Sequence, residues 1–135
     1  MILKSGAGLA GFSFPLATER DIEALELAVR QNTASRDQYV TFLQDYKSPR
    51  MDVANVFTDL FSDEALANYN YFGMTNRSRK KKAMRDYVIF TDCMLEAWES
   101  HGIGQDVLRE KITKVIARLN HKLRTRRYRS KTTAL

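Results

Sequence analysis

The sequence predicts an all-α fold: a compact bundle of five or six helices with a long basic C-terminal helix. Apolar residues recur at intervals of three and four, and residues that cap helices precede most of these stretches. No stretch alternates apolar and polar residues as a half-buried strand would. The 135 residues are 44% apolar and 28% charged, which is typical of one domain around a single core.

Three regions are predicted along the chain: an N-terminal arm over residues 1–17, a helical domain over residues 18–128, and a basic tail over residues 129–135. The arm is small, apolar and interrupted by glycines. Residues 6–11 match the G-x-G-x-x-G spacing of dinucleotide sites, but no strand precedes them and Pro15 follows closely. We therefore expect no cofactor.

The first helix is predicted over residues 19–31, ending near Asn32. Thr18 can cap it, because its hydroxyl can accept from a free backbone amide while Asp21 occupies the third helical position. The apolar residues on its buried face are Ile22, Leu25 and Val29.

Three shorter helices are predicted next. Ser35 with Gln38 repeats the capping pattern and starts the second helix, which ends before Ser48-Pro49 because proline disfavours the helical conformation in the residue before it. Asp52 caps a third helix. Ser62-Asp63-Glu64 starts a short fourth helix, with acids placed favourably in its first turn.

Two long helices complete the predicted bundle, after a packed turn over residues 68–73. The first begins near Lys80, ends before Gly102, and has an apolar stripe of Met84, Val88, Thr91, Leu95 and Trp98. The second runs from about Gln105 to Arg127. Its apolar stripe is Leu108, Ile112, Val115, Ile116, Leu119 and Leu123.

The net charge of +6 divides unevenly along the chain. Residues 1–76 hold six Lys/Arg and ten Asp/Glu, a balance of −4, whereas residues 77–135 hold sixteen and six, a balance of +10. A strongly basic half indicates a polyanionic partner, most commonly nucleic acid. No run of 18 apolar residues occurs, so we expect no membrane partner.

The basic residues form two clusters, one over residues 77–85 and one on the last helix. Helical spacing places five cations of the last helix on one basic stripe beside its apolar stripe: Lys111, Lys114, Arg118, Lys122 and Arg126. The helix can therefore dock and still present cations. Such a helix fits the major groove of DNA, where Asn120 and His121 can reach base edges. The predicted contact residues are Arg77, Arg79, Lys80, Lys81, Lys82, Lys111, Lys114, Arg118, Asn120, His121, Lys122, Arg124, Arg126, Arg127 and Arg129.

These clusters predict a nuclear domain that binds nucleic acid and acts in transcription or chromatin regulation. The predicted nucleic acid is double-stranded DNA. Three alternatives remain open. The basic helix face can be a solvated surface, and residues 77–82 can be a nuclear-import signal. The domain can also be a module for homo-oligomerisation or for binding a chromatin protein, in which the opposite-signed halves of neighbouring molecules pair.

Enzymatic activity is not expected. No nucleophile with a base and no pair of carboxylates in a cleft can be identified, and Asp92, Glu96 and Glu99 are predicted to form a solvated acidic stripe. The candidate metal ligands are His101, His121 and Cys93. They lie on different segments and do not share one helix face, so no metal site is predicted. The single cysteine excludes an internal disulfide.

Four segments, in this order, are similar to an uncharacterised arthropod domain family found in transposon-associated or chromatin-related proteins. They are Phe14-Pro15-Leu16, residues 57–61, residues 66–73 and residues 80–84, and the similarity covers about residues 14–127. The family's aromatic-x-Gly-x-x-Gly-Lys-Lys-Ala-aromatic pattern is altered here by Arg77-Ser78-Arg79. The family has no settled activity, so it implies no residue roles.

A more distant resemblance is to the BEN domain, an all-helical module. It rests on residues 60–66, on Gly73, and on the basic stretch over residues 116–124. The BEN family includes DNA-binding proteins of repressors and insulators, together with domains that mediate protein association. By this resemblance Asn120, Lys122 and Arg124 are expected to contact DNA.

Overall fold

The computed structural model describes residues 9, 11–75 and 80–133. Helix α1 (Glu19–Gln31) begins at the predicted cap. The Thr18 hydroxyl accepts from the Asp21 amide at 3.2 Å, and the Asp21 carboxylate accepts from the Thr18 amide at 3.2 Å. This reciprocal capping box confirms the predicted start, and the end at Asn32 is confirmed as well.

Helix α2 (Thr33–Tyr46) begins three residues earlier than predicted, since its cap is Asn32 and not Ser35. The prediction of a cap by Ser35 and Gln38 was wrong, because Asn32 ends α1 and also caps α2. Its side-chain oxygen accepts from two backbone amides of α2 at 2.8 and 3.2 Å. The end of α2 before Ser48-Pro49 is confirmed.

Helices α3 (Val53–Leu60) and α4 (Asp63–Leu66) begin as predicted, with Asp52 and Ser62 as their caps. The chain before α1 lies against them. The Leu16 amide donates to the Leu60 carbonyl at 2.8 Å, and Leu16 is almost fully buried. Leu16 thus belongs to the core, and Phe12 and Phe14 pack against it.

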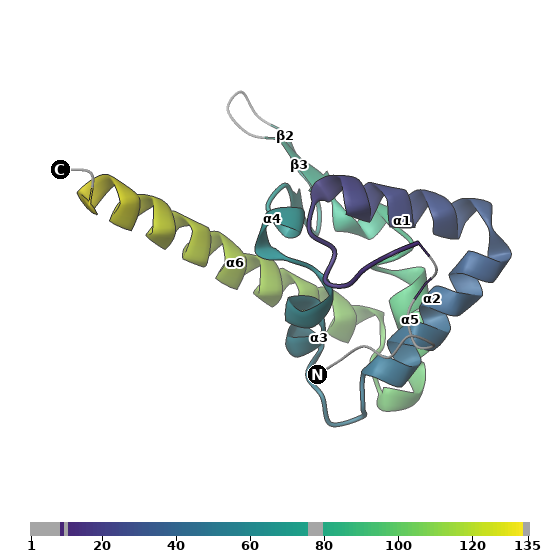
Figure 1. The fold of residues 1–135 in the computed structure, drawn as a ribbon. Coiled ribbons are helices and arrows are strands. Elements are labelled where there is room, and N and C mark those ends of the chain that lie inside the picture. Colours follow the sequence, from purple (N-terminus) through teal and green to yellow (C-terminus); the bar gives the residue numbers. More distant parts are fainter. Residues whose placement is uncertain (1–8, 10, 76–79, 134–135) are drawn as a thin grey trace.

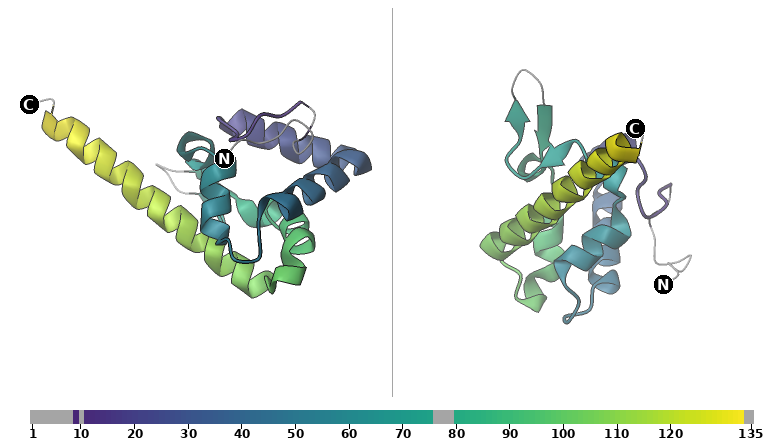
Figure 2. Two further views of the ribbon diagram at one scale, coloured as in Figure 1. Left: turned by 60° about the horizontal axis from the view of Figure 1, so that its bottom comes forward. Right: turned by 90° about the vertical axis from the view of Figure 1, so that its left-hand side faces the viewer.

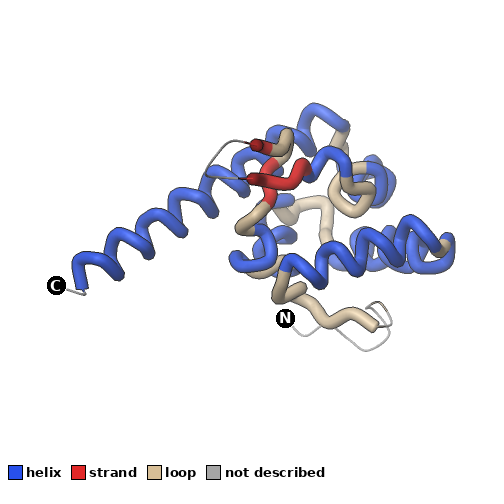
Figure 3. Tube along the Cα trace, turned by 90° about the horizontal axis from the view of Figure 1, so that it is seen from above, coloured by secondary structure: helices blue, strands red, loops and turns tan. Residues whose placement is uncertain are grey.

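The region after α4 contains strands, which were not predicted from the sequence. Strands β1 (Tyr69–Asn70), β2 (Met74–Thr75) and β3 (Lys80–Ala83), red in Figure 3, form a small sheet. The strand order is β1-β3-β2. Strand β3 lies parallel to β1 and antiparallel to β2.

The helix predicted from Lys80 to Gly102 was therefore wrong in its first half. Strand β3 is followed by a 3₁₀ turn (Met84–Asp86), and helix α5 (Asp92–Trp98) starts only after it and leads into a second 3₁₀ turn (Glu99–His101). The cause is Glu26 of α1, whose carboxylate accepts from the Val88 and Ile89 amides at 3.0 and 3.1 Å. These amides are bonded to another helix, so they cannot form the backbone hydrogen bonds of a continuous helix.

Gly73 gives the first testable prediction. It sits between β1 and β2 with φ of +83°, and a Cβ added there would lie 3.1 Å from the Ala83 Cβ. We expect Gly73→Ala to lower the free energy of unfolding by about 1–2 kcal/mol, because an L-residue is strained in this conformation. Gly104→Ala is the matched control, since a Cβ added at Gly104 would have nothing within 4 Å and its φ is not positive. Urea unfolding followed by circular dichroism measures both, and equal stability of the two variants would contradict the prediction.

Helix α6 (Gln105–Thr133) is the longest element and continues six residues past the predicted end at Arg127. It packs against α3, and its C-terminal part extends well beyond the body of the molecule (Figures 1 and 2). Four of its predicted apolar residues are buried in the common core: Leu108, Ile112, Ile116 and Leu119. None of the helices in the described ranges is long and apolar enough to cross a membrane.

The core is rich in aromatic rings. Phe57, Phe61 and Phe90 form a contiguous cluster with centroid separations of 5.3–6.0 Å, and Tyr69 joins it at 6.1 Å from Phe90. Trp98, from α5, is fully buried. The all-α class and the long C-terminal helix are thus confirmed, with the three-stranded sheet as an addition.

Candidate nucleic-acid interface

The basic stripe of α6 faces two acids of the α3–α4 region along one of its edges. Lys111 Nζ lies 3.6 Å from Asp52 Oδ1. Further along, Lys122 Nζ and Arg126 Nη2 lie 2.9 and 3.0 Å from the same oxygen, Oδ2 of Asp63. These cations, which the sequence indicated were available to DNA, therefore form ion pairs within the free protein.

Asp63 is stabilised as a carboxylate by this arrangement. The hydrogen bond from Lys122 lowers the pKa of the Asp63 carboxyl below its usual value, and Arg126 acts in the same direction. Asp63 keeps its negative charge throughout the neutral range as a result.

Lys114, Arg118 and Arg124 form no ion pair with another element among the described residues. Lys114 pairs at 3.0 Å with Glu110, its neighbour one turn back on the same helix. Arg118 and Arg124 are exposed and make no ion pair or hydrogen bond with any residue that the structure describes. His121 is exposed and Asn120 is half-buried.

The remaining predicted contacts of α6 and of the loop are placed as follows. Arg127 and Arg129 belong to the C-terminal turns of α6. Arg77 and Arg79 lie outside the described residues.

The lysines of β3 have structural partners. Lys82 Nζ lies 2.6 Å from Glu19 and 3.1 Å from Glu23, so it fastens the sheet to α1. Its hydrogen bond with Glu19 raises its pKa. The Lys81 ammonium donates to the Ala67 carbonyl. Lys80, at the start of the strand, is exposed.

Glu23 is the centre of a polar cluster that sequence reasoning missed. Its Oε2 accepts from the Tyr69 hydroxyl at 2.6 Å and from the Tyr87 hydroxyl at 2.5 Å, in addition to Lys82. Burial, together with the hydrogen bond to Glu23, raises the pKa of Tyr87 to about 12. The cluster joins three segments distant in sequence, and no local pattern in the sequence indicates it.

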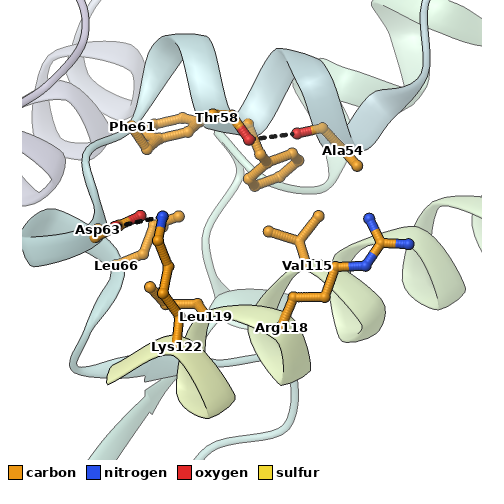
Figure 4. Close-up of a pocket in the computed structure, with 10 residues that line it drawn as sticks. Ala54, Thr58, Phe61, Asp63, Leu66, Val115, Arg118, Leu119 and Lys122 are labelled. Atoms are coloured by element: carbon orange, nitrogen blue, oxygen red, sulfur yellow. Dashed lines mark hydrogen bonds and ion pairs between the residues drawn. The ribbon is translucent and has the colours of Figure 1, made fainter. Parts of the chain in front are cut away.

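A groove lies between α6 and the α3–α4 pair, beside the stripe (Figure 4). Its volume is about 210 Å³, and apolar side chains form most of its wall. Lys122 points across it toward Asp63, whereas the guanidinium of Arg118 points away from Asp63 (Figure 4). The groove lining consists of Ala54, Phe57, Thr58, Phe61, Asp63, Leu66, Val115, Arg118, Leu119 and Lys122.

A second cavity, of about 470 Å³, lies on another part of the surface, near the start of α6. The Arg85 guanidinium lies 5.4 Å from the ring centroid of exposed Phe72 at its edge. The lining contains two arginines and two aspartates, so it has no excess of positive charge that would attract a polyanion. The cations that favour such a partner are those of α6.

Neither a metal centre nor a reactive thiol is apparent in the part of the chain that the structure describes. Within those ranges no three His, Cys, Asp or Glu residues are grouped to hold a metal ion. Cys93 is fully buried, and burial raises the pKa of its thiol to about 12. The thiol is therefore protonated at neutral pH and is a poor nucleophile.

The fold and the charge distribution define a small helical domain that presents a projecting basic helix. The family model of a domain of unknown function (DUF4806) matches residues 8–97, and the chain belongs to this family. The match ends before α6. A search of curated proteins and a search of solved structures each found no match.

Proposed function

We propose that the protein is a DNA-binding domain of the nucleus that contacts double-stranded DNA with the basic helix α6. The observation that carries the proposal is the composition of this helix. From residue 111 to residue 133 it contains nine Lys/Arg and no Asp/Glu. A single helix of this kind has the width of the DNA major groove, and its long basic side chains can reach phosphates on both sides.

Different side chains of α6 are proposed to make different kinds of contact. Arg118 and Arg124 are exposed and unpaired among the described residues, so they can bind phosphates without breaking an internal contact. Asn120 and His121 carry the donors and acceptors that read base edges. The resemblance to the BEN domain supports the same assignment for Asn120, Lys122 and Arg124.

The segment over residues 77–80 is proposed as a second contact or as a nuclear-import signal. Strands β2 and β3, which flank it, stand on the side of the body from which α6 projects (Figures 1 and 3). The resemblance to domains of transposon-associated and chromatin-related proteins supports a role at DNA.

Charge reversal at Arg124 tests the proposal. We expect Arg124→Glu to weaken binding to a mixed-sequence duplex by roughly fivefold or more and to reduce the slope of log K against log salt by about one, because one phosphate contact is lost. Arg50→Glu is the matched control, since Arg50 is exposed, is unpaired among the described residues, and lies in the loop between α2 and α3.

Fluorescence anisotropy of a labelled duplex, titrated at several salt concentrations, measures both variants. Equal weakening by the two substitutions would show that only total charge matters. An absence of binding by the wild-type domain at low salt would contradict the proposed function. A random competitor duplex then separates sequence-specific binding from charge attraction.

Association of opposite-signed halves from neighbouring molecules remains the second candidate. The ion pairs of Asp52 and Asp63 with α6, and of Glu19 and Glu23 with Lys82, join acidic and basic halves within one chain. This internal pairing leaves less charge for pairing between molecules. Light scattering across a range of salt concentrations tests it, and a strict monomer would contradict this candidate.

A further inference from the structure

One carboxylate oxygen holds two cations of α6 in the free protein. Oδ2 of Asp63 lies 2.9 Å from Lys122 Nζ and 3.0 Å from Arg126 Nη2. The two cations are four residues apart, one turn of the helix, and therefore lie on the same face. Glu64, the next residue of α4, is exposed and forms no ion pair with a described residue.

A phosphate group resembles the carboxylate in the features that matter here. Its anionic oxygens accept the same charge-assisted hydrogen bonds from Lys and Arg, at similar distances. A position where two cations already converge on one anionic oxygen is therefore a position that a phosphate oxygen can occupy.

We propose that Lys122 and Arg126 form a subsite for one backbone phosphate of DNA, and that Asp63 fills this subsite in the free protein. The inference rests on the proposed function, since it assigns a phosphate position within the same interface.

Displacement of Asp63 is feasible because the site is open to solvent. The exposed fractions are 33% for the Asp63 side chain, 54% for Lys122 and 56% for Arg126. Ion pairs this exposed contribute little to stability, so a phosphate brought in by the rest of the interface can replace the carboxylate. Asp63 thereby reduces affinity for DNA.

The prediction concerns Asp63→Asn, which removes the competing charge and keeps the shape of the side chain. We expect the variant to bind a mixed-sequence duplex roughly three- to tenfold tighter than wild type, with a salt slope steeper by about one. The matched control is Glu64→Gln, which changes the net charge equally at the neighbouring position but frees no cation. It should change affinity less than twofold.

A mutant cycle identifies the residues through which Asp63 acts. In a Lys122→Gln/Arg126→Gln background, Asp63→Asn should change affinity less than twofold, as Glu64→Gln does, because the cations that it would release are absent. Circular dichroism spectra and melting temperatures of all variants confirm that each is folded.

The outcomes separate the inference from the proposed function. If wild type binds DNA but Asp63→Asn and Glu64→Gln have equal effects, the subsite is wrong and the proposed function stands. If Asp63→Asn still tightens binding in the doubly substituted background, the phosphate lies elsewhere and the subsite is overturned. If neither wild type nor Asp63→Asn binds at low salt, both proposals are overturned.

Discussion

Trp98→Ala is expected to lower the free energy of unfolding by about 4 kcal/mol, because it leaves a large cavity in the core. Trp98 is fully buried at the end of α5. Its indole N–H donates to the Leu43 carbonyl of α2 at 3.1 Å, and the buried Lys47 ammonium lies 5.9 Å from its ring centroid. The substitution thus removes a packing contact and a hydrogen bond between α5 and α2.

Chemical unfolding followed by far-ultraviolet circular dichroism measures this effect, since Trp98 is the only tryptophan and cannot serve as the fluorescent probe. Phe72→Ala is the control, because Phe72 is 56% exposed. It should cost less than about 1 kcal/mol. Trp98→Phe separates packing from hydrogen bonding and should have an intermediate effect. A loss for Trp98→Ala no larger than that for Phe72→Ala would contradict the placement of α5.

Glu26→Gln is expected to lower the free energy of unfolding by about 2 kcal/mol, because a buried donor loses its acceptor. The Glu26 carboxylate is buried and accepts from Arg30 Nε at 2.5 Å and from the Val88 and Ile89 amides. These donors approach both oxygens. An amide in place of the carboxylate therefore directs an N–H group against at least one of them.

The control for Glu26→Gln is Glu64→Gln, an equal change of charge at an exposed position, which should change stability by less than about 0.5 kcal/mol. Hydrogen exchange gives a local measurement. The Val88 and Ile89 amides should lose protection in Glu26→Gln, whereas amides of α3 should keep it. Unchanged protection at both positions would contradict the role given to Glu26.

Local chemistry explains which elements were predictable from sequence. The caps at Thr18, Asp52 and Ser62 involve hydrogen bonds between residues two or three apart, so short patterns reveal them. The stretch over residues 80–91 was mispredicted because its partners are distant. Strand β3 pairs with β1, and Glu26 binds amides more than sixty residues away. Apolar spacing alone does not distinguish a helix from turns that bury the same side chains.

The positive charge of the candidate interface was predictable from the sequence, but the ion pairs that its cations form with Asp52 and Asp63 were not. A helical projection locates Lys111, Lys122 and Arg126 on one side of α6. It does not show which element packs beside that side. The acids at Asp52 and Asp63 were identified only as caps and first-turn residues, and their second role as counterions depends on how α3 and α4 pack against α6.

Helix α6 also sets where the chain can be shortened. The family match ends at residue 97, yet Ile112 and Leu119 complete the core after it. A recombinant fragment that ends at the family boundary would lack the buried residues of α6 and would expose that side of the core. Beyond Leu123 the described side chains are exposed or half-buried, so a stop codon placed there removes four arginines and one lysine while the interior stays closed.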